Sequence, residues 1–166
     1  MIRCIIGVLA VTLLLSPCKG FGETPSPEKI KEWFWSAQQG DAKAQSNIGW
    51  MYYKGQGAPQ DYTIALKWFR LAAQQDYAPA QYNLGVMYIK GAGVLRDDSE
   101  ALRWFLVAAQ QDYAPAQFNI GWIYEKSIEV PQDYTEALKW YRLAAQQEDA
   151  EVRSAAQQAL KRLGEN

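Results

Sequence analysis

The ten-residue string AAQQDYAPAQ occurs twice without change, at residues 72–81 and 108–117 of a chain of 166 residues. The two copies start 36 residues apart, and a looser copy, AAQQEDAE, starts another 36 residues on at Ala144. A fixed period of this length is typical of repeat proteins, whose small units bury their apolar faces only against neighbouring units. The period therefore predicts a row of similar units stacked side by side.

Aligning the chain on this period gives three repeats with atypical ends. We place repeat 1 at residues 44–79, repeat 2 at 80–115 and repeat 3 at 116–151. Residues 23–43 form an N-terminal segment with a capping helix, and residues 152–166 belong to a C-terminal capping helix. Residues 1–22 precede this array and differ from it in composition.

Each repeat contains two stretches with apolar residues at helical spacing, separated by a segment rich in Gly, Pro and Asp. In repeat 1 these stretches begin at Ala44 and at Ala65. The period of 3.6 residues dominates throughout, and no strand-like alternation competes with it. The sequence predicts an all-α fold, an α-solenoid of antiparallel helix pairs with about three and a half repeats.

The breaks between the helical stretches carry recognisable end signals. Asp61, Asp97 and Asp133 stand where a side-chain oxygen can cap the second helix of each repeat. Pro79 and Pro115 stand where the next first helix begins, a position at which the missing N–H costs nothing. The reused string therefore marks the corner between the end of one helix and the start of the next.

A glycine recurs in the middle of each first helix, at Gly49, Gly85 and Gly121. Glycine there costs about 1 kcal/mol relative to alanine. Its recurrence at one register predicts that another helix approaches too closely for a Cβ atom. The large side chains that we expect to face these glycines are Trp68, Trp104 and Trp140.

The N-terminus has the features of a secretory signal peptide. Arg3 precedes an unbroken apolar run, Cys4–Leu15, which spans only about 18 Å of a hydrocarbon core about 30 Å thick. The run is too short to cross a membrane and is typical of a cleaved signal, which predicts an exported, periplasmic or secreted protein. Lipid anchoring at Cys18 is the alternative, although Pro17 stands where a lipoprotein motif requires a small residue.

Composition excludes several classes of function. The net charge is −1 and there is no basic block, so nucleic acid is not an expected partner. The chain has 0 His, which removes imidazole bases and histidine metal sites. Since the carboxylates and serines form no catalytic pattern, we expect no enzyme activity, no metal and no cofactor.

Two short segments, KGQG at Lys54–Gly57 and KGAG at Lys90–Gly93, superficially resemble phosphate-binding loops. They follow predicted helices instead of strands, and they lack the downstream Gly-Lys-Ser/Thr that cradles a phosphate. We therefore interpret them as glycine-bent loops between helices.

The repeat pattern, A-x-x-x-L-G-x-x-Y-x-x-G-x-G-x-x-x-D-x-x-x-A-x-x-W-x-x-x-A-A, resembles that of the Sel-one-like repeat family, relatives of the tetratricopeptide repeats. Two departures affect loops. In repeat 3 Ser127 and Glu129 replace the loop glycines, and the glycine after the second helix survives only as Gly40. Asp76, Asp112 and Glu148 stand in its place in the repeats. The resemblance implies a right-handed superhelix whose first helices line a concave face. It also implies an adaptor or scaffold role with a protein or peptide partner.

Some positions on that implied concave face change from repeat to repeat while remaining mostly apolar or aromatic. Because aromatic residues dominate binding hot spots, we predict that these positions bind a partner. The alternative is that they pack on one another. An envelope glycan or peptidoglycan fragment is a second possible ligand, and a hydrolase is a weaker alternative. The predicted groove residues are Trp50, Tyr53, Tyr82, Val86, Ile89, Phe118, Trp122 and Glu125.

Overall fold

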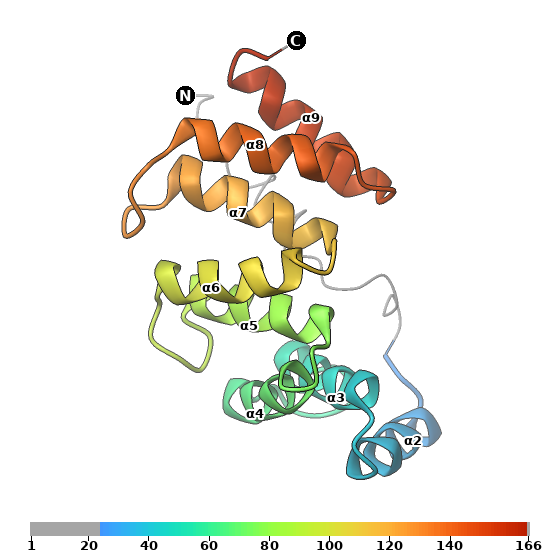
Figure 1. Cartoon of the computed structure of the whole chain (residues 1–166). Helices are drawn as coiled ribbons and strands as arrows, with labels where there is room; N and C mark the ends of the chain where they lie inside the picture. Colours follow the sequence, from blue (N-terminus) through green and yellow to red (C-terminus); the bar gives the residue numbers. More distant parts are fainter. Residues whose placement is uncertain (1–23, 166) are drawn as a thin grey trace, which may run out of the picture. The chain divides into compact units, whose positions relative to one another are not determined.

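A computed structural model describes residues 24–165, and within them the chain forms eight helices and no strand (Figure 1). The all-α prediction is therefore confirmed. The predicted signal peptide, residues 1–22, lies outside the described residues. The helices are α2 (Pro27–Gln38), α3 (Ala42–Lys54), α4 (Tyr62–Ala73), α5 (Ala78–Lys90), α6 (Asp98–Ala109), α7 (Ala114–Lys126), α8 (Tyr134–Ala145) and α9 (Ala150–Arg162).

The chain divides into two compact units, and the division falls inside α6 between Trp104 and Phe105. The described part of the first unit, residues 24–104, contains α2 to α5 and the start of α6. The second, residues 105–165, contains the end of α6 and α7 to α9. Each unit is described below by itself.

Neighbouring helices within a unit form antiparallel hairpins. In the first unit α2 packs on α3, α3 on α4 and α4 on α5, whereas in the second α7 packs on α8 and α8 on α9. The loop between paired helices closes with one backbone bond. Asp61 N–H donates to Tyr52 C=O at 3.0 Å, and Asp133 N–H donates to Tyr124 C=O at 2.9 Å. The start of the second helix therefore lies beside the end of the first.

The predicted caps are confirmed. In Asp61, Asp97 and Asp133 one carboxylate oxygen accepts from the backbone N–H three residues on, at 2.9, 2.8 and 3.0 Å respectively. Pro79 and Pro115 lie in the first turns of α5 and α7, where no intrahelical partner for an N–H is needed.

Two of the three helix glycines, Gly49 and Gly121, do lie against another helix, but the residues facing them are not the predicted tryptophans Trp68 and Trp140. A Cβ atom built on Gly49 would lie 2.8 Å from Cδ1 of Phe69, and one on Gly121 would lie 2.8 Å from Cδ1 of Tyr141. These rings follow the tryptophans by one residue and are almost fully buried, at 1% and 0% exposure.

The correction has a geometric cause. On α4 the residues at i, i+4 and i+7 are Ala65, Phe69 and Ala72, so this set faces α3. Trp68, one residue earlier, sits about 100° around the helix and is only partly buried. Its ring meets Phe34 of α2 edge-on, with centroids 6.2 Å apart. Trp104 and Trp140 are also only partly buried.

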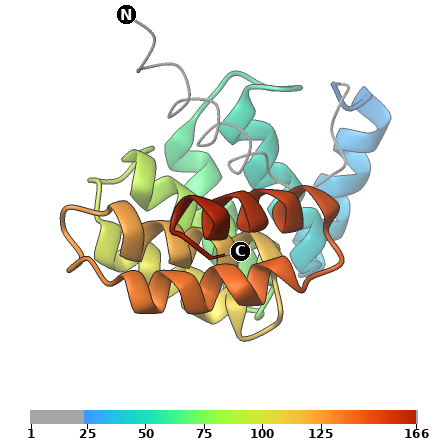
Figure 2. The same cartoon turned by 90° about the horizontal axis from the view of Figure 1, so that it is seen from above.

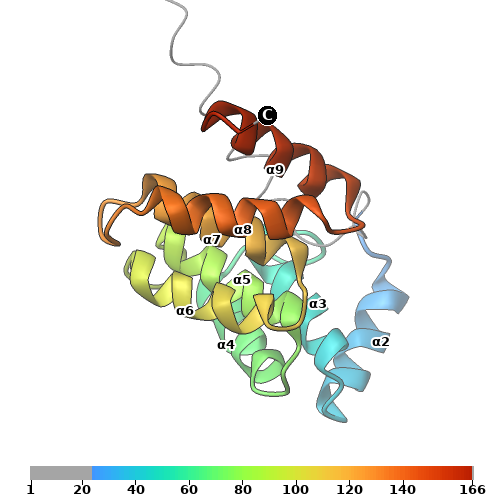
Figure 3. The ribbon, with the colours of Figure 1, turned by 45° about the horizontal axis from the view of Figure 1, so that its top comes forward.

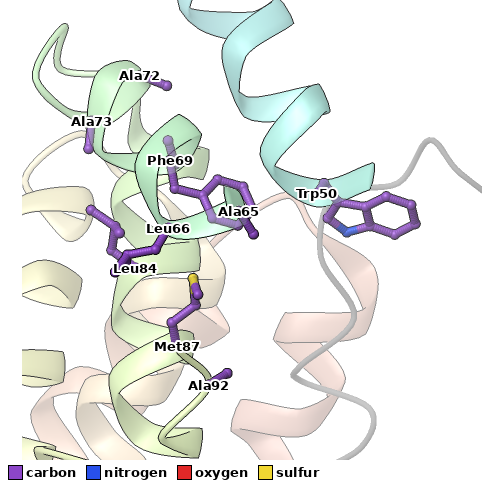
Figure 4. Packing of buried hydrophobic residues seen from close by; sticks show 10 residues of the cluster. Trp50, Ala65, Leu66, Phe69, Ala72, Ala73, Leu84, Met87 and Ala92 are labelled. Carbon is purple, nitrogen blue, oxygen red and sulfur yellow. The ribbon is translucent and has the colours of Figure 1, made fainter. Parts of the chain in front are cut away.

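The first unit has two buried clusters, one between α2 and α3 and one mainly between α4 and α5. Figure 4 shows Leu66 of α4 close to Leu84 of α5, with Met87 one turn further along α5. Ala65, Ala72 and Ala73 keep the helices close because they add little volume. The indole of Trp50 points away from Leu84 and Met87 in the same view.

Glutamines of the reused string join consecutive hairpins. Gln45, at the corresponding position before the first repeat, is buried and donates from Nε2 to the Ala37 carbonyl at 3.2 Å. Gln81 donates in the same way to the Ala73 carbonyl at 3.4 Å. Each bond adds a second donor to a carbonyl at the end of the preceding helix, which also accepts from a backbone N–H of the turn, Gly40 or Asp76, at 3.1 Å.

A second glutamine of the string bridges to the first. Gln75 Nε2 donates to Gln45 Oε1 at 2.8 Å in the first unit, and Gln147 Nε2 donates to Gln117 Oε1 at 3.1 Å in the second. Both pairs span 30 residues of sequence. The repeated string therefore supplies the glutamines that form the same hydrogen bond between hairpins in both units.

The second unit ends with α9 beside α8, as Figures 2 and 3 both show. Asp149 caps α9 by accepting from Glu151 N–H at 3.0 Å. Val152, Ala156 and Ala159 of α9 are buried in the cluster that also holds Tyr141 of α8. The predicted C-terminal helix is therefore present and packs with its apolar face inward.

Candidate partner-binding surface

The structure gives each of the predicted groove residues a place. Three of them, Tyr53, Ile89 and Trp122, are partly exposed. The other five are less than a tenth exposed: Trp50 8%, Tyr82 1%, Val86 4%, Phe118 4% and Glu125 1%. The groove itself stays a prediction. Only Tyr53, Ile89 and Trp122 present appreciable side-chain surface for a partner.

In the first unit, aromatic and basic side chains gather around Tyr53. The rings of Tyr53 and Tyr62 lie with their centroids 5.4 Å apart and their planes tilted by 54°. Lys90 Nζ lies 5.8 Å from the Tyr53 centroid, and Lys54 Nζ lies 6.0 Å from it. Lys54 Nζ is also 5.8 Å from the Trp50 ring. We call Trp50, Tyr53, Lys54, Tyr62 and Lys90 the Tyr53 cluster.

Local folding places these five residues together. Lys54 and Lys90 are the last residues of α3 and α5, and each is followed by a glycine in the left-handed region, Gly55 at φ 70° and Gly91 at φ 65°. These glycines end the helices in a conformation that other residues adopt at a cost. The KGQG and KGAG segments are therefore interhelix turns.

A close contact holds the turn after α5, the KGAG segment, against the start of α4. A Cβ atom on Gly93 would lie 2.9 Å from Cβ and 3.0 Å from the carbonyl carbon of Tyr62, the first residue of α4. Only glycine permits this approach, which lays the loop after α5 on the start of α4. The ends of α3 and α5 therefore both lie near the Tyr62 ring.

Burial controls the ionisation of the cluster. It raises the pKa of the Tyr53 phenol to about 12, with a further contribution from Tyr62, so the phenol stays neutral at physiological pH. Burial also lowers the pKa of Lys54, and the charge of Lys90 lowers it further. The pKa of Lys90 is lowered mainly by burial, against an opposing effect of Tyr62. The ammonium groups of Lys54 and Lys90 are thus both partly desolvated by the surrounding side chains.

Neither lysine of the cluster has an acidic partner among residues 24–165, although other charges in the same part of the chain do. Arg96 binds the buried Asp98 through two hydrogen bonds of 2.9 and 3.0 Å. Lys126, which ends α7 as Lys54 ends α3, pairs with Glu125 at 2.9 Å. The position of Tyr53 in repeat 1 is thus taken by a neutralising carboxylate in repeat 3.

Glu125 belongs to a network inside the second unit. Its Oε2 accepts from the Tyr141 hydroxyl at 2.8 Å and from Arg162 at 2.6 Å. With Lys126 on the other oxygen, the partners of the carboxylate come from α7, α8 and α9. The carboxylate is therefore engaged in holding helices together.

Sequence reasoning did not identify Lys54, Lys90 or Tyr62 as site residues. The sequence does carry a signal for the two lysines. A lysine ends the first helix of every repeat, at positions 54, 90 and 126, and the residue before it is Tyr, Ile and Glu respectively. Of these three preceding residues, only Glu125 can neutralise the charge of the lysine that follows it. The contact with Tyr62 depends on the Gly93 approach and leaves no pattern in the sequence.

Other kinds of site are not apparent. No group of three or more acidic or cysteine side chains within residues 24–165 is arranged to hold a metal ion. Over the same range, no helix has the length and apolar character needed to cross a bilayer.

The hairpins, their glycine contacts and their repeated polar bridges define a helical-hairpin repeat protein. Residues 42–77, 78–113 and 114–149 each match the model of the Sel1 repeat, so the chain belongs to the Sel1-repeat family. This frame starts two residues before ours and coincides with the first residues of α3, α5 and α7. The chain is thus an α-solenoid of a family that generally mediates protein–protein interactions.

Solved structures support this assignment. The chain is similar to a protective antigen of uropathogenic Escherichia coli strains with an SLR fold, at 39% identity and a TM-score of 0.73. It is also similar to a Sel1 repeat protein from Oxalobacter formigenes, at 35% identity and a TM-score of 0.69. The matches cover 79% and 78% of this chain but only 27% and 53% of those proteins. A comparison with curated proteins finds no match.

Proposed function

We propose that this chain is an exported, non-enzymatic scaffold that binds a protein or peptide through the Tyr53 cluster and the adjoining Ile89. The observation that carries the proposal is the partial exposure of Tyr53 and Ile89 at a register that differs between repeats. Core positions at the same helix ends, such as Met51 and Met87, keep their chemistry and are fully buried. Variation at an exposed register is what recognition of one particular partner requires.

The chemistry of the cluster suits a peptide. Tyr and Trp side chains supply large contact areas and lose few rotamers on binding, which is why they dominate interface hot spots. Ammonium groups beside the rings add donors that can fix the orientation of a bound chain. Trp122 is a separate candidate contact on the second unit, because it too is only partly buried.

Site-specific photo-crosslinking tests this surface in the native host. A photoreactive phenylalanine analogue replaces Tyr53 or Ile89, and the matched control places it at Leu71, an exposed apolar residue of α4. We expect a discrete adduct from positions 53 and 89 and none from position 71. Equal adducts from all three positions, or none from any, would remove the proposed surface. Retention of the chain on purified peptidoglycan, lost when Tyr53 is replaced, would favour the glycan alternative.

Export rests on residues 1–22 and has its own test. Mass spectrometry of the chain from fractionated host cells should find it outside the cytoplasm, starting after Cys18, Gly20 or Gly22. A chain of full length in the cytoplasm would contradict the proposal. An acylated N-terminal Cys18 would establish the lipid-anchored alternative.

A further inference from the structure

The unbalanced charge of the Tyr53 cluster points to the chemistry of its ligand. Lys54 and Lys90 both lie within about 6 Å of one phenol ring. Neither forms an ion pair with any of residues 24–165, whereas Lys126 at the equivalent place in repeat 3 does. Two like charges held near each other without an acid are costly unless something else compensates them.

We propose that the Tyr53 cluster binds a carboxylate of the partner between the ammonium groups of Lys54 and Lys90, with the neighbouring ring of Tyr53 contacting the apolar part of that residue. This inference rests on the proposed peptide-binding function and adds the partner's chemistry to it.

The charge balance favours an anion at this place. The C-terminal ends of α3 and α5 contribute together about one negative elementary charge through their helix dipoles. The two ammonium groups contribute two positive charges, so the net local charge is positive. Bringing in a carboxylate would reduce the repulsion from Lys90, which adds to the effect of burial in lowering the pKa of Lys54.

Repeat 3 shows what a carboxylate does in such a setting within this chain. Glu125 occupies the register of Tyr53, pairs with the helix-ending Lys126 at 2.9 Å and remains 1% exposed. Repeats 1 and 2 have no acid at this register, because Tyr53 and Ile89 stand there. A carboxylate supplied from outside would complete around Lys54 and Lys90 the pairing that repeat 3 makes internally.

The two lysines cannot distinguish the carboxylate of an Asp or Glu side chain from that of a peptide C-terminus. An ammonium group is a compact charge and lacks the planar, bidentate geometry of a guanidinium group. Both sources supply the same carboxylate. The experiment below therefore separates them by comparing a free with an amidated C-terminus.

The test uses random peptides selected on the immobilised full chain, followed by affinity measurements with synthetic copies. Wild-type chain is compared with the double variant Lys54→Met/Lys90→Met, which keeps the apolar stems and removes both charges. The matched control, Lys43→Met/Lys67→Met, removes two charges from exposed lysines elsewhere on α3 and α4. Both double variants should retain the helical circular dichroism of wild type.

We expect the selected peptides to contain an acidic residue or to require a free C-terminus. The Lys54/Lys90 variant should bind them about ten-fold more weakly, while the control binds as wild type does. Replacing the peptide's Glu by Gln, or amidating its C-terminus, should cause the same loss in wild type and little further loss in the variant.

The outcomes separate the two proposals. Peptides that bind through Tyr53 without a carboxylate, or acidic peptides that bind the Lys54/Lys90 variant as tightly as wild type, would overturn the carboxylate site and leave the peptide-binding function intact. If no peptide binds wild type and the crosslinks at positions 53 and 89 also fail, the proposed function falls and the carboxylate site falls with it.

Discussion

The guanidinium group of Arg162, in the last turn of α9, donates a hydrogen bond of 2.6 Å to the carboxylate of Glu125, which precedes it by 37 residues at the end of α7. The Tyr141 hydroxyl of α8 donates to the same oxygen at 2.8 Å. A single carboxylate, 1% exposed, therefore joins the last three helices of the chain. Because the charge is buried, its partners determine whether it stabilises the unit.

Tyr141→Phe should lower the free energy of unfolding by about 1.5–3 kcal/mol, the usual range for a hydrogen bond to a charged group. The ring that fills the space against Gly121 remains, so the loss reports the hydroxyl alone. Urea unfolding measures it, with Tyr134→Phe as the control because Tyr134 on the same helix is 52% exposed. Equal stability of the two variants would mean that the Tyr141–Glu125 bond contributes nothing.

The Glu125 carboxylate should also affect how the free energy of unfolding depends on pH in the acid range. Burial tends to raise the pKa of Glu125, but hydrogen bonds from Lys126, Arg162 and Tyr141 outweigh it and hold the pKa below its usual value of 4.5. The folded state therefore binds this proton less readily than the unfolded state. The resulting stabilisation is present above pH 4.5 and is lost as the pH falls through the lowered pKa.

Glu125→Gln removes this titration, so its stability should fall less between neutral pH and acid than that of wild type. Urea unfolding across that range gives the profile. Glu148→Gln, at an exposed position of the same unit, should keep the wild-type slope. A wild-type slope in Glu125→Gln would show that other groups cause the acid sensitivity.

Gly49→Ala tests the close approach of α3 and α4. Alanine should gain about 1 kcal/mol in helix propensity but would place Cβ 2.8 Å from the Phe69 ring, and such overpacking costs about 1–3 kcal/mol. We expect a net loss of stability. Asn47→Ala, which adds no atom toward Phe69, should be neutral or stabilising by less than about 1 kcal/mol. Thermal unfolding of both variants decides the matter, and a stabilised Gly49→Ala would contradict the contact.

The glutamine bridges give a further prediction. Gln45→Met keeps the volume but loses the donation to the Ala37 carbonyl and the bond from Gln75. The Ala37 carbonyl keeps the bond from Gly40 N–H at 3.1 Å, so the variant loses two side-chain hydrogen bonds, which should lower the free energy of unfolding by about 1–3 kcal/mol. Gln38→Met, at an exposed position near the end of α2, is the control. Hydrogen exchange should show faster opening of α2 in Gln45→Met only, because this bridge joins α2 to α3.

Sequence periodicity was sufficient to predict the helices, their caps and the close approach of another helix at Gly49 and Gly121. It could not choose between adjacent aromatic residues for that notch. Trp68 and Phe69 differ by about 100° around the helix, and both are compatible with an apolar face more than 100° wide. The choice depends on a third helix, because Trp68 of α4 contacts Phe34 of α2.

The candidate site was harder to predict because its contacts join residues far apart in sequence. Glu125 was assigned to the groove from its register alone, whereas the partner Arg162 lies in a helix outside the repeats. The third-repeat loop shows the same limit. Ser127, in place of a glycine, ends α7 in an extended conformation, and its hydroxyl accepts from Glu129 and Val130 N–H at 3.2 and 3.0 Å. The turn at Ser127 therefore needs no residue in the left-handed conformation, which is why repeat 3 can lack the glycine.

Asp76 and Asp112 take the place of the family's glycine and adopt its left-handed conformation, with φ of 56° and 55°. A residue with a Cβ pays about 1–2 kcal/mol there, and only short polar side chains reduce this cost by local hydrogen bonding. Asp76→Ala should therefore lower the free energy of unfolding by about 1 kcal/mol, whereas Asp76→Gly should not lower it. Glu148, the third-repeat equivalent, is not among the non-glycine residues with positive φ, so Glu148→Ala should be neutral. Urea unfolding of the three variants checks the order, and equal effects of alanine at positions 76 and 148 would show that the left-handed turn carries no strain.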